Sequence, residues 1–256
     1  MGYGSMEAES ISGVGLRVLN RDVIKYIAMF TMLLNHIAHV FLASGTVLCE
    51  VFEDIGYFTA PVMCFFLVEG YGYTRSKTKY GLRLLLFAVI SQIPYSLAFQ
   101  FGNLSMIYTL LCCFLILVAM EKITNPCFRM IVCMLLLIAT LVSDWALLAP
   151  IYTVMIHNSK GNPKKMAASY GAAYALFAGL NLLNYLDGAQ GIQIVYAIVR
   201  ALASGLGIIA AAVAVLVFYN GKRAEKGRNF SKWFFYIFYP SHLMILYLVK
   251  MYVVTV

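Results

Sequence analysis

The amino-acid sequence predicts an all-α fold, a polytopic bundle of about nine transmembrane helices. Of its 256 residues, 62% are hydrophobic and 12% are charged, whereas a soluble domain is nearer half apolar and a quarter charged. The apolar residues gather in stretches long enough to cross about 30 Å of hydrocarbon. Between these stretches, basic connectors alternate with connectors that carry no lysine or arginine. Together the three observations predict a multi-pass membrane protein.

The first helix is expected at 22–43, after a polar cytoplasmic segment at 1–21. This first apolar run is too long for the hydrophobic region of a cleavable signal peptide, so it is expected to stay in the chain as a signal anchor. From there on, the sequence is interpreted as a single transmembrane domain, 22–256. The further helices are expected at 55–74, 81–100, 104–120, 127–142, 145–157, 165–184, 192–219 and 233–254.

The basic residues predict the orientation of the chain. All but two of the 19 lysines and arginines lie in or next to the N-terminal segment and the connectors after helices two, four, six and eight. By the positive-inside rule this side faces the cytoplasm, which predicts an N-in, C-out topology in a bacterial-type cytoplasmic membrane. The formal net charge of +8 therefore reports orientation first, and a nucleic-acid partner is not expected.

Several kinds of chemistry have no motif in this sequence. The six cysteines lie in or beside apolar runs and form no CxxC pair, and no histidines have the spacing of metal ligands, so neither a disulfide framework nor a metal site is expected. The sequence also contains no GxSxG, P-loop or HExxH motif.

The first predicted helix places a cation and an imidazole on one face. Lys25 and His36 are 11 residues apart, which on an α-helix is three turns plus about 20° and roughly 16 Å. A long ligand with anionic groups at one end and a reactive group at the other would fit this arrangement. Two alternatives stay open: Lys25 could serve the positive-inside rule alone, and His36 could be a buried histidine with a structural hydrogen bond.

Two further ionisable groups lie inside predicted helices, where such groups are expensive and often functional. His242 follows Pro240 in the last helix, and the proline is expected to kink the helix beside a cavity that His242 faces. A structural role for His242 is the alternative. Glu69 lies near the cytoplasmic end of the second helix, where it could pair with Arg75 or Arg83 or take part in function.

Arg200, Asp144 and His39 are less decisive. Arg200 lies about 12 Å from the outer end of its helix, where it is expected to face an ion-pair partner or a watery cavity. Asp144 stands at an outer junction and could cap the helix that follows. A structural role is favoured for His39.

These residues lie in stretches that resemble the TraX family, whose founding member acetylates the N-terminus of F-type pilin. The most specific stretches are the middle block and the C-terminal block with its Tyr-Pro-x-His sequence. The matching stretches are KYIAMFTMLLNH (25–36), DIGYFTAPVMCFFLVEGYGYTRSKTKYGLR (54–83), LFAVISQIP (86–94), SDWALL (143–148) and residues 220–250, which contain NGKR and KWFFYIFYPSHLMILYL.

The Lys-x10-His pattern is also similar to the (Arg or Lys)-x10-His motif of the acyltransferase-3 superfamily. This resemblance implies a central pore, with acetyl-CoA as co-substrate from the cytoplasm. His36 would act as general base or, alternatively, form an acetyl-histidine intermediate. Lys25, Arg75 and Arg83 would hold the CoA phosphates, with Glu69 in the same cofactor-binding set.

On the acceptor side, the resemblance implies that His242 and Asp144 are catalytic, orienting an acceptor or relaying protons, as Glu69 could also do. The acceptor would be a peptide, a protein N-terminus such as that of pilin, or a glycan. The sequence departs from the family at Asn35, where Asp is common, at Gln92, where an acidic residue is common, and at Ala149–Pro150, where a glycine is usual. The competing hypotheses are a secondary transporter using Arg200 and His242, and a catalytically silent membrane scaffold.

Overall fold

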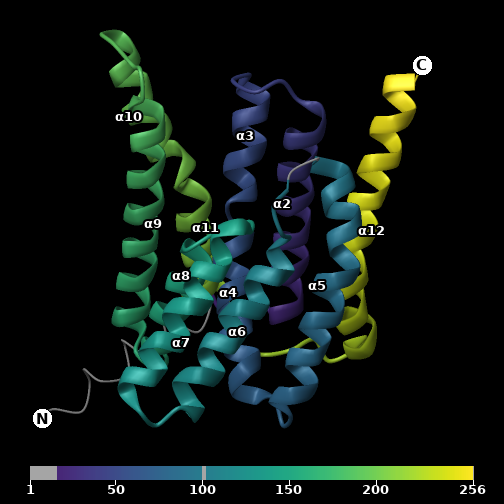
Figure 1. Cartoon of the computed structure of the whole chain (residues 1–256), viewed down its shortest axis with the longest axis vertical. Coiled ribbons are helices and arrows are strands. Elements are labelled where there is room, and N and C mark those ends of the chain that lie inside the picture. Colours follow the sequence, from purple (N-terminus) through teal and green to yellow (C-terminus); the bar gives the residue numbers. More distant parts are fainter. Residues whose placement is uncertain (1–15, 100–101, 256) are drawn as a thin grey trace, which may run out of the picture.

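The computed structural model describes residues 16–99 and 102–255, and its regular elements in these ranges are all helical (Figure 1). They form one bundle of roughly parallel and antiparallel helices. The elements are α2 (Arg21–Phe41), α3 (Val47–Gly56), α4 (Thr59–Tyr73), α5 (Lys77–Phe99), α6 (Met106–Lys122), α7 (Pro126–Ala139), a 3₁₀ turn (Thr140–Val142), α8 (Leu148–Asn158), α9 (Pro163–Leu186), α10 (Ile192–Ser204), α11 (Leu206–Val213), a π-helical turn (Ala214–Phe218) and α12 (Arg228–Thr255).

Each of the nine predicted segments corresponds to a helical stretch of the structure. Six stretches are long and apolar enough to cross a membrane, which confirms a helical protein with several candidate membrane spans. Two of the six, Val47–Tyr73 and Ile192–Phe218, contain interruptions that the sequence interpretation did not predict. The stretches at α6, at Pro126–Val142 and at α8 are shorter.

The second predicted helix begins earlier than expected. The sequence predicts a connector at 44–54, but α3 starts at Val47, and the Thr46 hydroxyl accepts a hydrogen bond from the backbone amide of Cys49 at 3.4 Å. The carboxylates of Glu50, Glu53 and Asp54 therefore lie on a helix. Their charge lowers the apolar signal of the segment, which is why hydropathy alone assigns it to a loop.

The interruption between α3 and α4 is held by a close contact with α11. A Cβ atom built on Gly207 would lie 2.5 Å from the backbone oxygen of Asp54 and 2.7 Å from the backbone nitrogen of Phe58. Only a residue without a Cβ fits there. The break in one candidate span is thus packed directly against the backbone of another.

Helix α2 and helix α9 belong to opposite sides of the bundle. Helix α2 packs against α3, α4 and α12, while α9 packs against α8, α10 and α11 on the opposite side (Figure 1). The backbone oxygen of Ala28 in α2 accepts hydrogen bonds from the hydroxyls of Thr31 and Thr59, at 3.0 and 2.8 Å. These bonds fasten α4 to the middle of α2.

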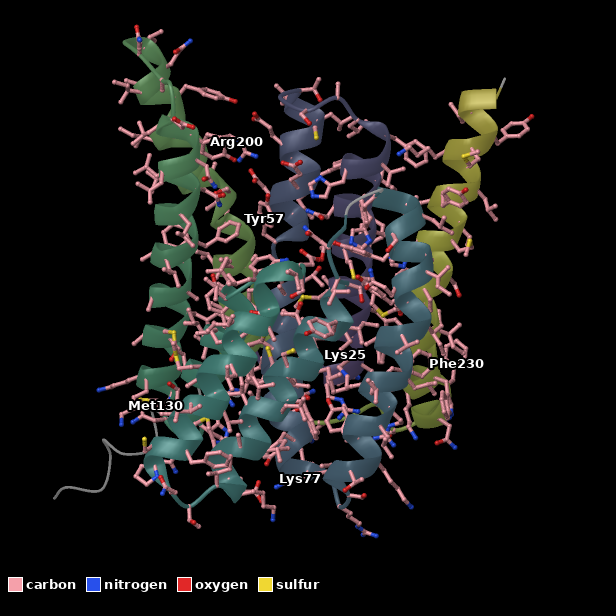
Figure 2. The ribbon with its side chains drawn as sticks, in the orientation of Figure 1. Lys25, Tyr57, Lys77, Met130, Arg200 and Phe230 are labelled. Atoms are coloured by element: carbon pink, nitrogen blue, oxygen red, sulfur yellow. The ribbon has the colours of Figure 1, made fainter. Side chains whose placement is uncertain are left out.

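The ends of α4, α5 and α6 meet at Glu121. The Lys77 ammonium and the Tyr71 hydroxyl both donate to its carboxylate. The hydrogen bond from Lys77 lowers the pKa of Glu121 to about 2. Lys77 lies at the lower edge of the molecule in Figure 2.

The start of α2 is joined to a segment that lies some 200 residues later in the chain. The backbone amide of Leu19 donates to the Phe218 oxygen and that of Asn220 donates to the Leu19 oxygen, both at 2.9 Å. The amide of Ala224 donates to the Asp22 carboxylate at 2.8 Å. These bonds fix residues 218–224 against the start of α2.

Candidate functional site

Helix α2 places Lys25 and His36 as the sequence predicts. The helix runs without a break from Arg21 to Phe41, and the Asn20 side chain accepts hydrogen bonds from the amides of Asp22 and Val23, both at 3.0 Å. An N-cap of this kind satisfies amides that the first turn leaves free. At 1.5 Å per residue, Lys25 and His36 lie about 16 Å apart along one helix.

His36 is paired with the other predicted histidine, His242 of α12. Nδ1 of His36 and Nε2 of His242 are 2.7 Å apart, and the two rings are nearly parallel, with an interplanar angle of 4°. Both side chains are buried. Nδ1 of His242 lies 2.8 Å from the backbone oxygen of Phe238. The structure thus joins two histidines that lie 206 positions apart in the sequence.

These contacts determine where the ring protons lie. A carbonyl oxygen only accepts hydrogen bonds, so Nδ1 of His242 carries a proton and donates it to Phe238. In the neutral pair, Nε2 of His242 then holds a lone pair and accepts from Nδ1–H of His36. The second nitrogen of His36, Nε2, is therefore left with a lone pair. Among the described residues no hydrogen bond occupies this nitrogen, and such a nitrogen is a proton acceptor.

A small cavity of about 30 Å³ lies beside His36. This is room for about two water molecules. Asp144 lines the cavity with His36, so the structure brings these two predicted catalytic residues to one place. The other lining residues are Met32, Asn35, Gly56, Tyr57, Thr59, Ala60, Met106, Trp145 and Tyr239.

The loop that carries Asp144 is strained. Trp145 and Leu147 have φ angles of 57° and 60°, a region that bulky residues rarely adopt. The Trp145 ring stacks on Phe177 of α9, with centroids 5.4 Å apart, and the Thr109 hydroxyl donates to the Asp144 backbone oxygen at 2.6 Å. Backbone strain held by its surroundings is typical of functional sites. Asp144 precedes α8 by four positions and does not cap it, because the N-cap position is Leu147.

Two residues that depart from the family pattern have structural roles. The Asn35 side chain donates to the backbone oxygen of Glu53 at 3.2 Å and packs where Gly56 leaves space. The group that orients His36 is therefore His242, and not the neighbour at position 35. The Gln92 side chain accepts from the Ser105 amide at 2.9 Å and donates to the Asn103 oxygen at 3.0 Å. It thereby positions the start of α6.

Lys25 lies at the opposite end of the stripe, in the lower half of the bundle (Figure 2). Its ammonium lies over the rings of Phe66 and Phe235, at 5.4 and 5.0 Å from their centroids. Glu69 is close to Lys25, but its carboxylate accepts from the Tyr219 hydroxyl at 2.6 Å. The sequence suggested Arg75 or Arg83 as partners of Glu69, and the structure pairs it with a tyrosine instead.

Further arginines gather around Lys25. Arg21 and Arg223 are both close enough to Lys25 to interact with it electrostatically. Tyr80 lies near both Arg21 and Arg83. Nε of Arg21 and Nε of Arg83 are buried without a hydrogen-bond partner. Arg75 is exposed in the connector after α4. The structure thus adds Arg21 and Arg223 to the predicted set and leaves Arg75 at the edge.

Arg200 forms a separate cluster near the other end of the molecule (Figure 2). Its Nη1 donates to both carboxylate oxygens of Asp54 at 2.8 Å, and its Nε lies 3.2 Å from Glu50. Glu53 lies 4.0 Å away and is also 3.2 Å from Nδ1 of His39. The predicted partner of Arg200 is therefore a set of three carboxylates on α3. His39 has the structural role that was favoured for it.

The sequence interpretation missed Arg21, Arg223, Tyr219 and Tyr239. Arg223 belongs to the NGKR stretch, so that motif is the signal that could have found it. Nothing in the sequence shows that residues 218–224 return to the start of α2. In the part of the chain that the structure describes, no three histidine, cysteine, aspartate or glutamate side chains form a group that could hold a metal ion.

Comparison with known proteins identifies the family. The sequence profile of the TraX protein family matches residues 20–250. A protein of Dichelobacter nodosus described as "Probable fimbrial assembly protein FimC, serogroup H1" is 30% identical over 243 residues, which cover 90% of this chain and 95% of that protein. No solved structure matches. The family profile and the relative together confirm the resemblance of the sequence motifs, and the chain belongs to the TraX family.

Proposed function

We propose that the protein is an integral membrane acetyltransferase. It would move an acetyl group from cytoplasmic acetyl-CoA to an amine or hydroxyl acceptor at or across the membrane. The observation that carries the proposal is the pairing on α2 of Lys25, within a group of arginines, with His36, whose Nε2 is a free proton acceptor. Acetyl-CoA matches this arrangement, since its anionic phosphates and its reactive thioester are at opposite ends of the molecule.

The group around Lys25 suits the anionic end of CoA. Arginine is well matched to phosphate because its planar fork donates several hydrogen bonds. Nε of Arg21 and Nε of Arg83 are buried without partners, and a buried donor without a partner is costly. Phosphate oxygens would satisfy them, with Lys25 and Arg223 adding charge. Acetyl-CoA itself supplies an activated acetyl group as a thioester.

His36 would carry the proton through the transfer. As the acceptor attacks the thioester carbon, Nε2 of His36 takes the proton from the attacking amine or hydroxyl. The carbon–sulfur bond then breaks, and the thiolate takes that proton from Nε2 to leave as a free thiol. The proton balance closes within one turnover, and the histidine pair returns to its neutral form.

A peptide or protein N-terminus is the favoured acceptor. The relative from Dichelobacter nodosus is described as a fimbrial assembly protein, which supports a pilin-type chain. Asp144 lines the cavity beside His36 together with Trp145 and Tyr57. A carboxylate with aromatic faces attracts an ammonium group, so an amine would be held there and would react once it has lost its proton.

The proposal is tested with purified protein, acetyl-CoA and a synthetic pilin N-terminal peptide, with transfer followed by mass spectrometry. We expect His36→Ala to lower kcat by about 10²–10⁴-fold, the range for a general base. His157→Ala is the matched control, because His157 lies near the end of α8 and outside the site. Undiminished acetylation by His36→Ala would show that the mechanism is wrong.

Binding of the co-substrate is tested separately. Acetyl-CoA should raise the melting temperature of the wild type, and Lys25→Ala should weaken this binding by about tenfold or more. Lys250→Ala, at the far end of α12, is the control for loss of a positive charge. A transporter that uses Arg200 and His242 needs no CoA, so the absence of any stabilisation by acetyl-CoA would favour that alternative.

A further inference from the structure

Two side-chain hydroxyls, one at the start of α6 and one on α12, are buried without hydrogen-bond partners. They are the hydroxyls of Ser105 and Tyr239. Ser105 is the N-cap of α6, yet its side chain makes no capping hydrogen bond. Its hydroxyl is therefore one polar group without a partner. The first backbone amides of α6 are further hydrogen-bond donors, since the first amides of a helix have no partner within it. A helix of 17 residues also brings partial positive charge to this end.

Tyr239 connects this helix end with the histidine pair. Its side chain is 5% exposed, and its ring is edge-on to His36 and His242, with centroids 6.1 and 5.6 Å apart. Its hydroxyl lies beside the backbone amide of Met106, the first residue of α6. His36, Met106 and Tyr239 all line the cavity of about 30 Å³. The buried Tyr239 hydroxyl, the first residue of α6 beside it and the proton acceptor His36 thus line one small space.

We propose that the Tyr239 hydroxyl and the Met106 amide form an oxyanion hole for the thioester carbonyl. This inference rests on the proposed function and assigns the carbonyl oxygen a binding place. The cavity has room for about two water molecules, which is close to the size of an acetyl group. The oxygen lies between the two donors, and the carbon is then within the cavity that His36 lines.

The chemistry needs such donors. When the acceptor lone pair attacks the carbonyl carbon, the C=O electron pair moves to the oxygen, which becomes an oxyanion. The Tyr239 O–H and the Met106 N–H donate to it. When the intermediate collapses, the electron pair reforms C=O and the carbon–sulfur bond breaks. Donors placed in advance at a developing charge are worth more in a site that excludes water.

Asp144 sets the orientation of the acetyl group. Its carboxylate lines the same cavity and is close enough to Tyr239 to interact with it electrostatically. A carboxylate repels an oxyanion, so the carbonyl oxygen points to α6 and the acceptor amine lies on the Asp144 side. The Asp144 carboxylate then faces the positive charge that develops on the attacking amine, and the start of α6 faces the negative charge on the oxygen.

Tyr239→Phe tests the proposal because it removes the hydroxyl and keeps the ring. We expect kcat to fall by about 10²–10³-fold, the range for the loss of one oxyanion donor, while stabilisation by acetyl-CoA and the KM for acetyl-CoA stay unchanged. The control is Tyr170→Phe. Tyr170 is also buried with an unpartnered hydroxyl, but it lines a different cavity with Tyr152 and Ser169. It should retain wild-type kcat.

The outcomes separate the two proposals. If the wild type acetylates the peptide and Tyr239→Phe is as fast as the wild type, the oxyanion hole is wrong and the acetyltransferase stands. If Tyr239→Phe and Tyr170→Phe lose the same activity, the loss comes from packing and the oxyanion hole is again wrong. If the wild type neither transfers nor hydrolyses acetyl-CoA, the proposed function fails and this inference with it.

Discussion

Arg200 shows how a charge is kept inside an apolar chain. Its side chain is 6% exposed, and all of its close partners are on α3, where the carboxylates are about a fifth exposed. Tyr196 donates to Glu50 at 2.6 Å, and Arg200 also lies over the Tyr185 ring at 5.9 Å. A buried ion pair is weak evidence for net stability, but loss of one member leaves the others uncompensated. Here the loss of Arg200 would leave three carboxylates without their cation.

Arg200→Ala should therefore destabilise the protein by about 3–5 kcal/mol, the range for breaking a buried ion pair. Thermal denaturation in detergent measures this. Glu50→Gln is the comparison, because it keeps the shape and removes one of three carboxylates, and its effect should be much smaller. Equal stability of Arg200→Ala and the wild type would mean that the cluster is solvated.

His242 holds the ring proton of His36 on Nδ1, by accepting a hydrogen bond from it. Without the acceptor at Nε2, His36 is no longer held with its proton on Nδ1, so the fraction with a lone pair on Nε2 falls. His242→Ala should lower kcat by about 10²-fold, and His242→Gln should recover much of it, because the amide oxygen accepts from Nδ1–H. The KM for acetyl-CoA should not change.

Ring ¹⁵N NMR of histidine-labelled protein checks the cause. The wild type should have the His36 proton on Nδ1, and His242→Ala should shift it to Nε2. A wild-type His36 with its proton on Nε2 would contradict the geometry. The rate should also rise with pH until His36 and the acceptor amine are both unprotonated, because each acts only in that form.

At the scale of elements, the interrupted spans matter most. The break between α3 and α4 places Gly56 and Tyr57 at the cavity, and Gly207 of α11 holds the break from behind. The sequence shows both apolar stretches and their small residues. It does not show the interruption, because hydropathy sums over a window and a tertiary contact between two backbones has no local signature.

Gly207→Ala should weaken this contact. The added carbon would lie 2.5–2.9 Å from three backbone atoms, and backbone moves less easily than a side chain, so we expect a loss of about 1–3 kcal/mol. Gly179→Ala in α9 is the control, since a Cβ there meets nothing within 4 Å. The melting temperatures of the two variants are compared, and that of Gly207→Ala should be the lower. Equal melting temperatures would contradict the close packing at Gly207.

For the whole molecule, the alternation of charge predicts the orientation, and composition predicts the helical membrane fold. The stripe on α2 also follows from spacing alone, because an unbroken helix fixes the distance between Lys25 and His36. The partners of these residues do not follow from the sequence. Phe66, Tyr219 and His242 come from α4, from the end of the π-helical turn and from α12, and only the folded chain brings them together.

The two ends of α9 test the orientation. In a background with the six cysteines replaced by serine, Lys164→Cys should be shielded from a membrane-impermeant maleimide in intact cells. Asp187→Cys should react with it. Both positions are exposed, so membrane sidedness alone separates them. The reverse labelling pattern would place the basic connectors outside the cytoplasm.

The contacts between the start and the end of the chain have a consequence for biosynthesis. Residues 218–224 complete the surroundings of Lys25, and His242 completes those of His36. Translation proceeds from the N-terminus, so α2 enters the membrane long before its partners are made. Contacts of such sequence separation form late in folding. A chain that stalls on the ribosome before residue 218 would therefore lack the late partners at both ends of the stripe, and one that stalls just before α12 would still lack His242. The proposed transfer would thus begin only after the last helix is made.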